Sequence, residues 1–228
     1  KMLMIVRREG RVLRRYVHLG TGNYHTGTTH VYTDYGLMTC DKDIGSDAHK
    51  VFQQLTGLGK VSKLKRLLQS PFTLHKTLLQ YIGRETELAR KGKTARIVAK
   101  MNSITEKKII DALYDASRAG VRVDLIIRGI CNLRPGIAGV SENIQVRSIV
   151  GQFLEHTRIV YFHNDGDPEI LCGSADWMER NLFSRVEVVF PIIDPVLRDR
   201  VYKEGLAPYL TDNTQAWLLQ SNGSYMRV

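Results

Sequence analysis

Apolar and polar residues alternate along several short stretches of the chain, whereas in longer stretches the apolar residues recur every three or four positions. A period of two is typical of strands that bury one face, and the longer period is typical of amphipathic helices. The pattern predicts strands at residues 2–6, 94–100, 121–127, 159–162 and 184–193. It predicts helices at residues 42–57, 71–91 and 105–119.

Capping residues mark where these helices are expected to begin and end. Ser70 followed by Pro71 predicts a capped start for the second helix. Either Ser103 or Thr105 is predicted to cap the third helix, and Gly120 to close it. The basic stretch 60–66 lies between the first and second helices and is predicted to be a linker.

The middle of the chain indicates where a ligand would bind. Strand 94–100, helix 105–119 and strand 121–127 follow one another, which implies two parallel strands joined by a right-handed crossover. Arg128 comes directly after the second of these strands. Open α/β sheets bind ligands beyond the carboxyl ends of their strands, so we expect Arg128 to grip phosphate oxygens bidentately.

Two parts of the chain look like copies of one unit. Residues 20–41 align without a gap with residues 173–194, a shift of 153 positions (173 − 20). Few of the aligned pairs are identical, and chance therefore remains an alternative. The chemically similar pairs are Gly20 and Gly173, Thr21 and Ser174, and Asp34 and Glu187.

The second copy carries a set of side chains suited to phosphate chemistry. His156 can attack a substrate or relay a proton near neutral pH. Arg158 lies two residues further along a predicted strand, and therefore on the same face. Ser174 follows a glycine, and such a pair places backbone N–H groups and a hydroxyl near oxyanions.

Glu187 stands alone in an apolar run, where an unpartnered carboxylate is costly. We expect His156 to be its partner, because a carboxylate fixes the tautomer of an imidazole and raises its basicity. Asp34 would do the same for a histidine of the first copy. The alternative is a surface pairing of Glu187 with Arg185, which would contribute little.

The composition of the chain indicates which molecules it would bind and in which compartment it would be found. Lys and Arg exceed Asp and Glu by ten (33 − 23), which favours polyanionic partners such as nucleic acid, anionic lipid or polyphosphate. A surface charge that only keeps the protein in solution is the alternative. Three widely spaced cysteines fit neither a disulfide framework nor a zinc site, and predict a reduced, cytoplasmic protein.

Several longer sequence motifs resemble those of a known protein family. A histidine and a cation two residues apart, a Gly-Ser or Gly-Thr pair and a later acid resemble the phospholipase D superfamily. The residues between and around these positions are more similar to the C-terminal half of the bacterial ATP-polyphosphate kinases of the histidine-phosphorylating type. The matching phrases are H-x-G-T-G-N at His18, Y-T-D-Y-G-L at Tyr32, R-G-I-C at Arg128, E-H-x-R at Glu155 and S-A-D-W-M-x-R-N at Ser174.

The resemblance implies an α/β fold of the phospholipase D type, a mixed or parallel sheet flanked by helices. Residues 1–66 would be the end of one such domain and residues 67–228 a second, complete one. Lys1 would be the lysine of the first H-x-K. The histidine two residues before it, which the family phosphorylates, would then lie outside this sequence, and residues 1–228 would be inactive alone.

The reaction implied is reversible transfer of the ATP γ-phosphate through a phosphohistidine to inorganic polyphosphate. Lys1, Arg128 and Arg158 would neutralise phosphate charge, and Tyr32 would contact the nucleotide. Ser174 would bind phosphate. His156 would act as acid–base partner or hold phosphoryl oxygens, with Glu187 and Asp34 as the orienting carboxylates.

The resemblance implies that magnesium accompanies ATP and that its protein ligands lie upstream of these residues, and no carboxylate cluster is evident here to replace them. The resemblance also implies ATP, ADP and polyphosphate as partners, a homo-oligomeric intact enzyme, no nucleic acid, and a cytoplasmic protein in peripheral contact with the inner membrane.

Two other classes of function stay open. One is a phosphodiesterase of the phospholipase D type acting on lipid or nucleic acid, although Arg158 and Asp176 replace its usual lysine and asparagine. The other is a non-catalytic polyanion-binding module.

Overall fold

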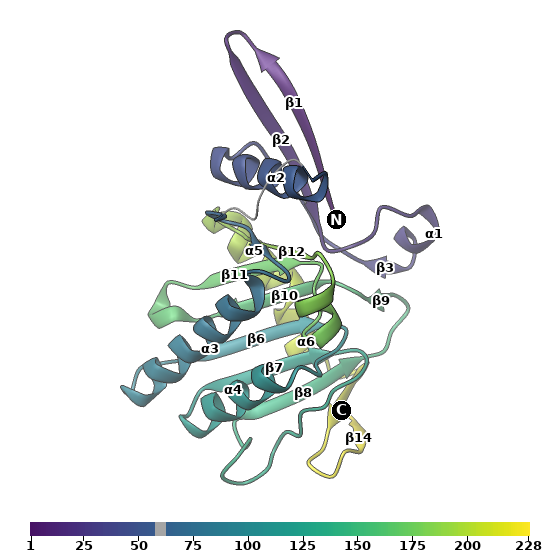
Figure 1. The fold of residues 1–228 in the computed structure, drawn as a ribbon. Helices are drawn as coiled ribbons and strands as arrows, with labels where there is room; N and C mark the ends of the chain where they lie inside the picture. The colour runs from purple at the N-terminus through teal and green to yellow at the C-terminus, as the bar shows by residue number, and fades with distance from the viewer. Residues whose placement is uncertain (58–62) are drawn as a thin grey trace.

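A nine-stranded mixed sheet forms the centre of the molecule in the computed structural model, which describes residues 1–57 and 63–228 (Figure 1). Strands β6, β7 and β8 run parallel, and the other neighbours in the sheet are antiparallel. The predicted parallel pair is therefore confirmed. In spatial order the strands are β14 (Tyr225–Arg227), β13 (Ala216–Leu219), β8 (Ile144–Ile149), β7 (Arg122–Ile127), β6 (Arg96–Met101), β10 (Arg158–Phe162), β11 (Glu169–Gly173), β12 (Val188–Pro191) and β5 (Leu68–Gln69).

Helices cover the sheet because its strands bury side chains on both faces. Ile97 and Ala99 of β6 share one core with the long helices α3 and α4, which lie side by side in Figure 1. Val98, between them, points into a second core on the opposite face, as expected for a strand. The helices are α2 (Lys42–Leu55), α3 (Leu74–Arg90), α4 (Lys107–Arg118), α5 (Pro195–Gly205) and α6 (Ala207–Thr211).

The first part of the chain forms a smaller, three-stranded sheet whose hairpin projects from the top of Figure 1. Val17 and Leu19 of this sheet and Ile44 of α2 pack into the second core, so the small sheet is fixed to the large one. The chain then adds a short helix and a two-residue strand that pairs with another from the second part. These elements are β1 (Met2–Glu9), β2 (Val12–Gly20), α1 (Thr26–Thr29), β3 (Tyr32–Thr33), β4 (Gly36–Thr39) and β9 (Leu154–Glu155).

Strand register confirms the internal repeat. Gly20 of β2 pairs with Gly36 of β4, and a shift of 153 turns this pair into Gly173 and Val189, which pair in β11 and β12. The preceding hairpins agree as well. The Gly20 N–H donates to the Lys1 carbonyl at 2.9 Å, and Gly173 lies opposite Arg158. Lys1 and Arg158 therefore hold equivalent positions in the two copies.

Several predicted boundaries are wrong. Helix α3 begins at Leu74, not at Pro71, because the Ser70 N–H still donates to the Glu187 carbonyl as the sheet ends. The carboxylate of Glu106 caps α4 in place of Ser103 or Thr105. A short π-helix, η2 (Arg180–Ser184), occupies the start of the strand predicted at 184–193, which shortens to β12. The linker predicted at 60–66 lies partly outside the described residues.

Candidate functional site

The pairing of β3 with β9 joins the two copies of the repeat. Tyr32 lies opposite Leu154 and Thr33 opposite Glu155 in a parallel register, so the next residue on each side is brought to the same place. Those next residues are Asp34 and His156. Nδ1 of His156 lies 2.9 Å from each carboxylate oxygen of Asp34. One residue of the pair thus comes from each copy.

The environment of Asp34 fixes the direction of this hydrogen bond. The Thr21 hydroxyl donates to Oδ1 at 2.6 Å, while its own oxygen accepts the Tyr35 N–H at 2.9 Å. An ionised carboxylate only accepts, so Nδ1 of His156 carries the proton. Nε2 of His156 is then the ring atom with a free lone pair, as in other carboxylate-oriented histidines.

Arg158 lies against the ring of His156. Its Nη1 donates to the His156 carbonyl at 2.8 Å and lies 3.2 Å from Nδ1 and 3.0 Å from Nε2. Its Nε and Nη2 form a bidentate pair with the carboxylate of Asp176, at 3.2 and 3.1 Å. Burial raises the pKa of Asp176, but Arg158 and the hydrogen bonds from Asn102 outweigh it, so the pKa lies below its usual value.

Asn102 extends this network to Arg128. Its backbone N–H donates to Asp176 at 2.8 Å, and its side-chain oxygen accepts Nε and Nη2 of Arg128 at 3.0 and 2.8 Å. Sequence reasoning missed Asn102, although it follows β6 directly. The rule that placed Arg128 beyond β7, namely that ligands bind past the carboxyl ends of parallel strands, would have identified it.

Glu187 does not bind His156, and that predicted pairing is wrong. The Ser174 hydroxyl donates to one oxygen of Glu187, and Nδ2 of Asn181 donates to the other at 2.9 Å. The bond from Ser174 to Glu187 reproduces the bond from Thr21 to Asp34 in the other copy, 13 residues apart in each case. Each carboxylate is held by a hydroxyl of its own copy, and Asp34 also faces a histidine of the other copy.

Ser174, which was expected to bind phosphate, hydrogen-bonds to protein groups in this structure. The Ser174 N–H donates to the Val188 carbonyl at 3.2 Å and its hydroxyl to Glu187, so in this arrangement neither donates to a phosphate oxygen. Lys1 is half-buried, and burial lowers the pKa of its side chain. The charge of Glu187 opposes that shift and the charge of Arg158 adds to it. The Lys1 carbonyl accepts the Gly20 N–H, and Nη1 of Arg158 donates to the carbonyl of the next residue, Thr21, at 3.4 Å, so Lys1 and Arg158 both contact this segment of β2 and the residue after it.

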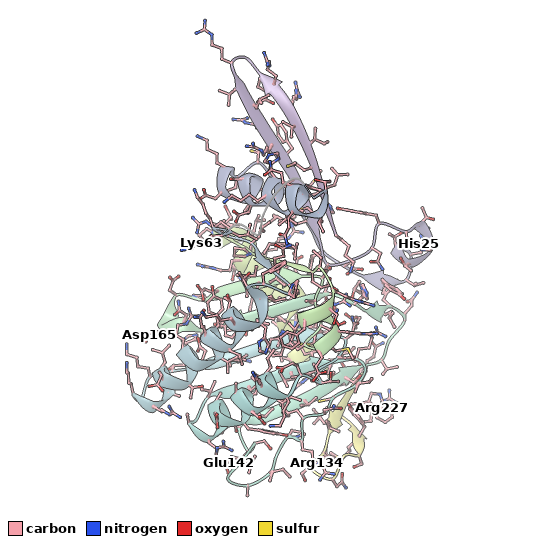
Figure 2. All side chains as sticks on the ribbon, in the orientation of Figure 1. His25, Lys63, Arg134, Glu142, Asp165 and Arg227 are labelled. Carbon is pink, nitrogen blue, oxygen red and sulfur yellow. The ribbon has the colours of Figure 1, made fainter. Side chains whose placement is uncertain are left out.

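A cavity of about 280 Å³ opens beside the dyad of Asp34 and His156. Tyr32 and Asp34 line it, together with Asn23 and Thr28 from the segment around α1. The Tyr32 ring centroid is 4.7 Å from that of His156, so the tyrosine forms a wall between cavity and dyad. His25, labelled in Figure 2, lies at the start of α1 on the same side of the molecule.

The site does not fit a divalent cation. Within residues 1–57 and 63–228, no three His, Cys, Asp or Glu side chains are grouped so that they could hold a metal ion. The three carboxylates at the centre already accept hydrogen bonds from protein donors. No step involving a protein-bound metal follows from these residues.

Comparison with known proteins gives consistent results. The family model for polyphosphate kinase C-terminal domain 1 matches residues 1–61, and the model for C-terminal domain 2 matches residues 67–228. The whole chain is 60% identical to a polyphosphate kinase from Xylella fastidiosa and 59% identical to one from Pseudomonas aeruginosa. In both cases it spans 33%, about a third, of the relative's length.

The fold agrees with a solved structure of the same kind. The crystal structure of polyphosphate kinase from Porphyromonas gingivalis matches all of this chain with a TM-score of 0.94 at 37% identity, over 35% of the solved chain. The predicted fold class, a mixed sheet flanked by helices, is confirmed. No helix in the described part of the chain is long and apolar enough to cross a membrane.

Proposed function

The chain belongs to the polyphosphate kinase family, and from that premise we propose that it contributes to reversible transfer of the ATP γ-phosphate, through a phosphohistidine, to inorganic polyphosphate. One observation carries the proposal. Residues of the two repeats meet in a single site where a histidine oriented by a carboxylate, His156, lies beside Arg158.

The reaction proceeds in two balanced steps. A histidine nitrogen attacks the γ-phosphorus of ATP, the bond to the β–γ bridging oxygen breaks, and ADP leaves. A terminal oxygen of polyphosphate then attacks the same phosphorus, and the phosphorus–nitrogen bond breaks. Such transfers depend chiefly on positioning and charge neutralisation, which we assign to Lys1, Arg128 and Arg158.

His156 acts at Nε2 in this proposal. Asp34 holds the Nδ1 proton, and Nη1 of Arg158 lies at similar distances from both ring nitrogens. The guanidinium would bind a phosphoryl oxygen that approaches, while Nε2 accepts or returns a proton. Tyr32 and the cavity beside it are proposed to take the nucleotide.

Glu187 is assigned to the other histidine. The family pattern places the phosphorylated histidine two residues before Lys1, and the charge of Glu187 acts on Lys1. Since Asp34 of the first copy orients His156 of the second, Glu187 of the second copy is proposed to orient the histidine of the first. Ser174 and Asn181 support Glu187 there.

Incubation of the full-length protein with ATP labelled at the γ-phosphate tests the proposal. We expect label on the protein that is stable in base and labile in acid, release of ADP, and labelled polyphosphate. His156→Ala should abolish polyphosphate synthesis. A phosphodiesterase of the phospholipase D type would use water as acceptor and make no polymer, and a non-catalytic module would release no ADP; either result refutes the proposal.

We also propose three properties of the intact enzyme. Magnesium enters with ATP, held by residues outside 1–228. The intact enzyme is a homo-oligomer in the cytoplasm. The net charge of +10 allows peripheral contact with an anionic membrane surface, although the reaction above does not depend on it.

A further inference from the structure

A buried ion pair lies directly beside the dyad and takes no part in the reaction described above. Nζ of Lys100 is 2.6 Å from Oε2 of Glu155, and the two side chains are 2% and 12% exposed. Lys100 belongs to β6, a central strand of the large sheet, and Glu155 belongs to β9 and immediately precedes His156. A charged pair in this position connects the sheet to the strand that carries the histidine.

Thr33 completes a clamp across the junction of the two copies. Its hydroxyl donates to the same Oε2 of Glu155 at 3.0 Å, and its oxygen accepts the His156 N–H at 3.2 Å. Thr33 also immediately precedes Asp34. Strands β3 and β9 contribute only two residue pairs, so their own ladder is short. The clamp therefore fixes the residues on both sides of the dyad.

The lysine is also held by α6, which packs on the same face of the sheet as its side chain. Its ammonium lies 3.6 Å from the ring centroid of Tyr209 in α6, a cation–π contact. Arg147 of β8 donates to the carbonyls of Tyr209 and Leu210 at 3.1 and 2.6 Å, which fixes the end of α6. Burial, followed by hydrogen bonding to Glu155 and then by its charge, raises the pKa of Tyr209, so its hydroxyl stays neutral beside the pair.

Stability alone gives no reason for this arrangement, because apolar side chains of similar volume usually serve a protein interior as well as a buried ion pair does. Burial lowers the pKa of Lys100, and only Glu155 and, more weakly, Asp34 oppose that shift. Its contacts with the junction therefore offset the cost of burying the lysine. A role in positioning the residues of the site explains this ion pair, which stability alone does not explain.

We propose that Lys100, Glu155 and Thr33 are positioning residues, which hold the His156 ring against Asp34 by fixing β3 and β9 to the central sheet. The inference rests on the proposed function, because its consequence is measured as phosphoryl transfer. None of the three contacts the reacting atoms, so each acts through the dyad.

Thr33 offers a matched pair of variants for the test, made in the full-length protein. Thr33→Ser keeps the hydroxyl, and Thr33→Val keeps the shape without it. Displacing a catalytic group slightly costs up to about a hundredfold in rate, so we expect Thr33→Val to lower kcat for polyphosphate synthesis about ten- to a hundredfold and Thr33→Ser to restore most of it. In an Asp34→Asn background, Thr33→Val should add little further loss.

A carboxylate-to-amide comparison separates positioning from folding. Glu155→Gln removes the charge next to the dyad. Asp124→Asn does the same to a carboxylate that is 3% exposed and paired with Arg96 at 2.8 Å, three residues before the end of β7 and away from the dyad. Both changes should lower the melting temperature, and only Glu155→Gln should lower kcat strongly.

Equal kcat values in the two Thr33 variants, or equal losses in Glu155→Gln and Asp124→Asn, would overturn the inference. So would a full further loss from Thr33→Val in the Asp34→Asn background. If a glutamine at 155 prevents folding, the Thr33 pair decides the matter. Failure of the proposed function is distinct, since the unaltered protein would then make no polyphosphate.

Discussion

The bond between Asp34 and His156 predicts that the two residues act as one unit. Asp34→Asn keeps the size of the side chain and removes the charge that faces Nδ1. Both carboxylate oxygens lie 2.9 Å from Nδ1, and the side chains of His156 and Asp34 are 9% and 24% exposed. The dyad is therefore mostly screened from water, with Asp34 the wetter partner.

The magnitude follows from these contacts. A hydrogen bond to a charged group contributes about 1.5–3 kcal/mol net. Each 1.4 kcal/mol or so of transition-state stabilisation corresponds to about tenfold in rate, so the range is about ten- to 150-fold. Because solvent reaches Asp34, we expect the lower half of that range for Asp34→Asn, about ten- to fortyfold.

The assay is kcat for polyphosphate synthesis in the full-length protein, measured for Asp34→Asn, His156→Ala and the double variant. His156→Ala should be nearly inactive, and the double variant should be no worse, because residues that act as a unit are non-additive. Glu187→Gln is the matched control, since Glu187 has no contact with His156. The loss of rate caused by Glu187→Gln should be as large in the Asp34→Asn background as in the unaltered protein.

Two results would refute the reasoning. If the losses of Asp34→Asn and His156→Ala multiply in the double variant, the two residues act independently. If Asp34→Asn retains the full rate while Glu187→Gln shows the non-additive behaviour with His156→Ala, the carboxylates have been assigned to the wrong histidines.

Other predictions concern acid stability, salt and the isolated chain. The pKa of Asp176 is depressed on folding, so its contribution to stability is present above the unfolded value near 3.8 and is lost as the pH falls through the lower folded value; thermal melts from pH 5 to pH 2 should show a smaller acid-induced loss in Asp176→Asn. Residues 1–228 should bind polyphosphate with an affinity that falls steeply with salt, because their net charge is +10, and an affinity unchanged between low and moderate salt would contradict this. The same residues, expressed alone, should show a cooperative melt, because both hydrophobic cores lie within them; a melt without a cooperative transition would contradict this.

Local signals in the sequence predicted local structure well. Strand 121–127 is β7, and Gly120, with a φ of +95°, takes the left-handed conformation that ends the preceding helix. The helix start at Ser70 failed because a capping signal competes with tertiary structure. At Ser70 the backbone still hydrogen-bonds to the sheet, and α3 begins four residues later, at Leu74.

The site was predicted in its members and not in its pairings. His156, Arg158 and Asp34 were identified as candidates and do lie in contact with one another. Which carboxylate faces His156 depends on the two-residue contact between β3 and β9, and two residue pairs leave no periodic signal in a sequence. Thr21 could have been assigned to Asp34 from its alignment with Ser174, once one of the two pairs was known.

A pulse and chase on the full-length protein tests the central claim most directly. The protein is labelled briefly with ATP carrying a labelled γ-phosphate, separated from nucleotide, and divided between unlabelled ADP and unlabelled polyphosphate. The account predicts that ADP recovers the label as ATP and that polyphosphate takes it up at chain ends, with both transfers lost in His156→Ala. Release of the label as inorganic phosphate under both conditions would contradict it.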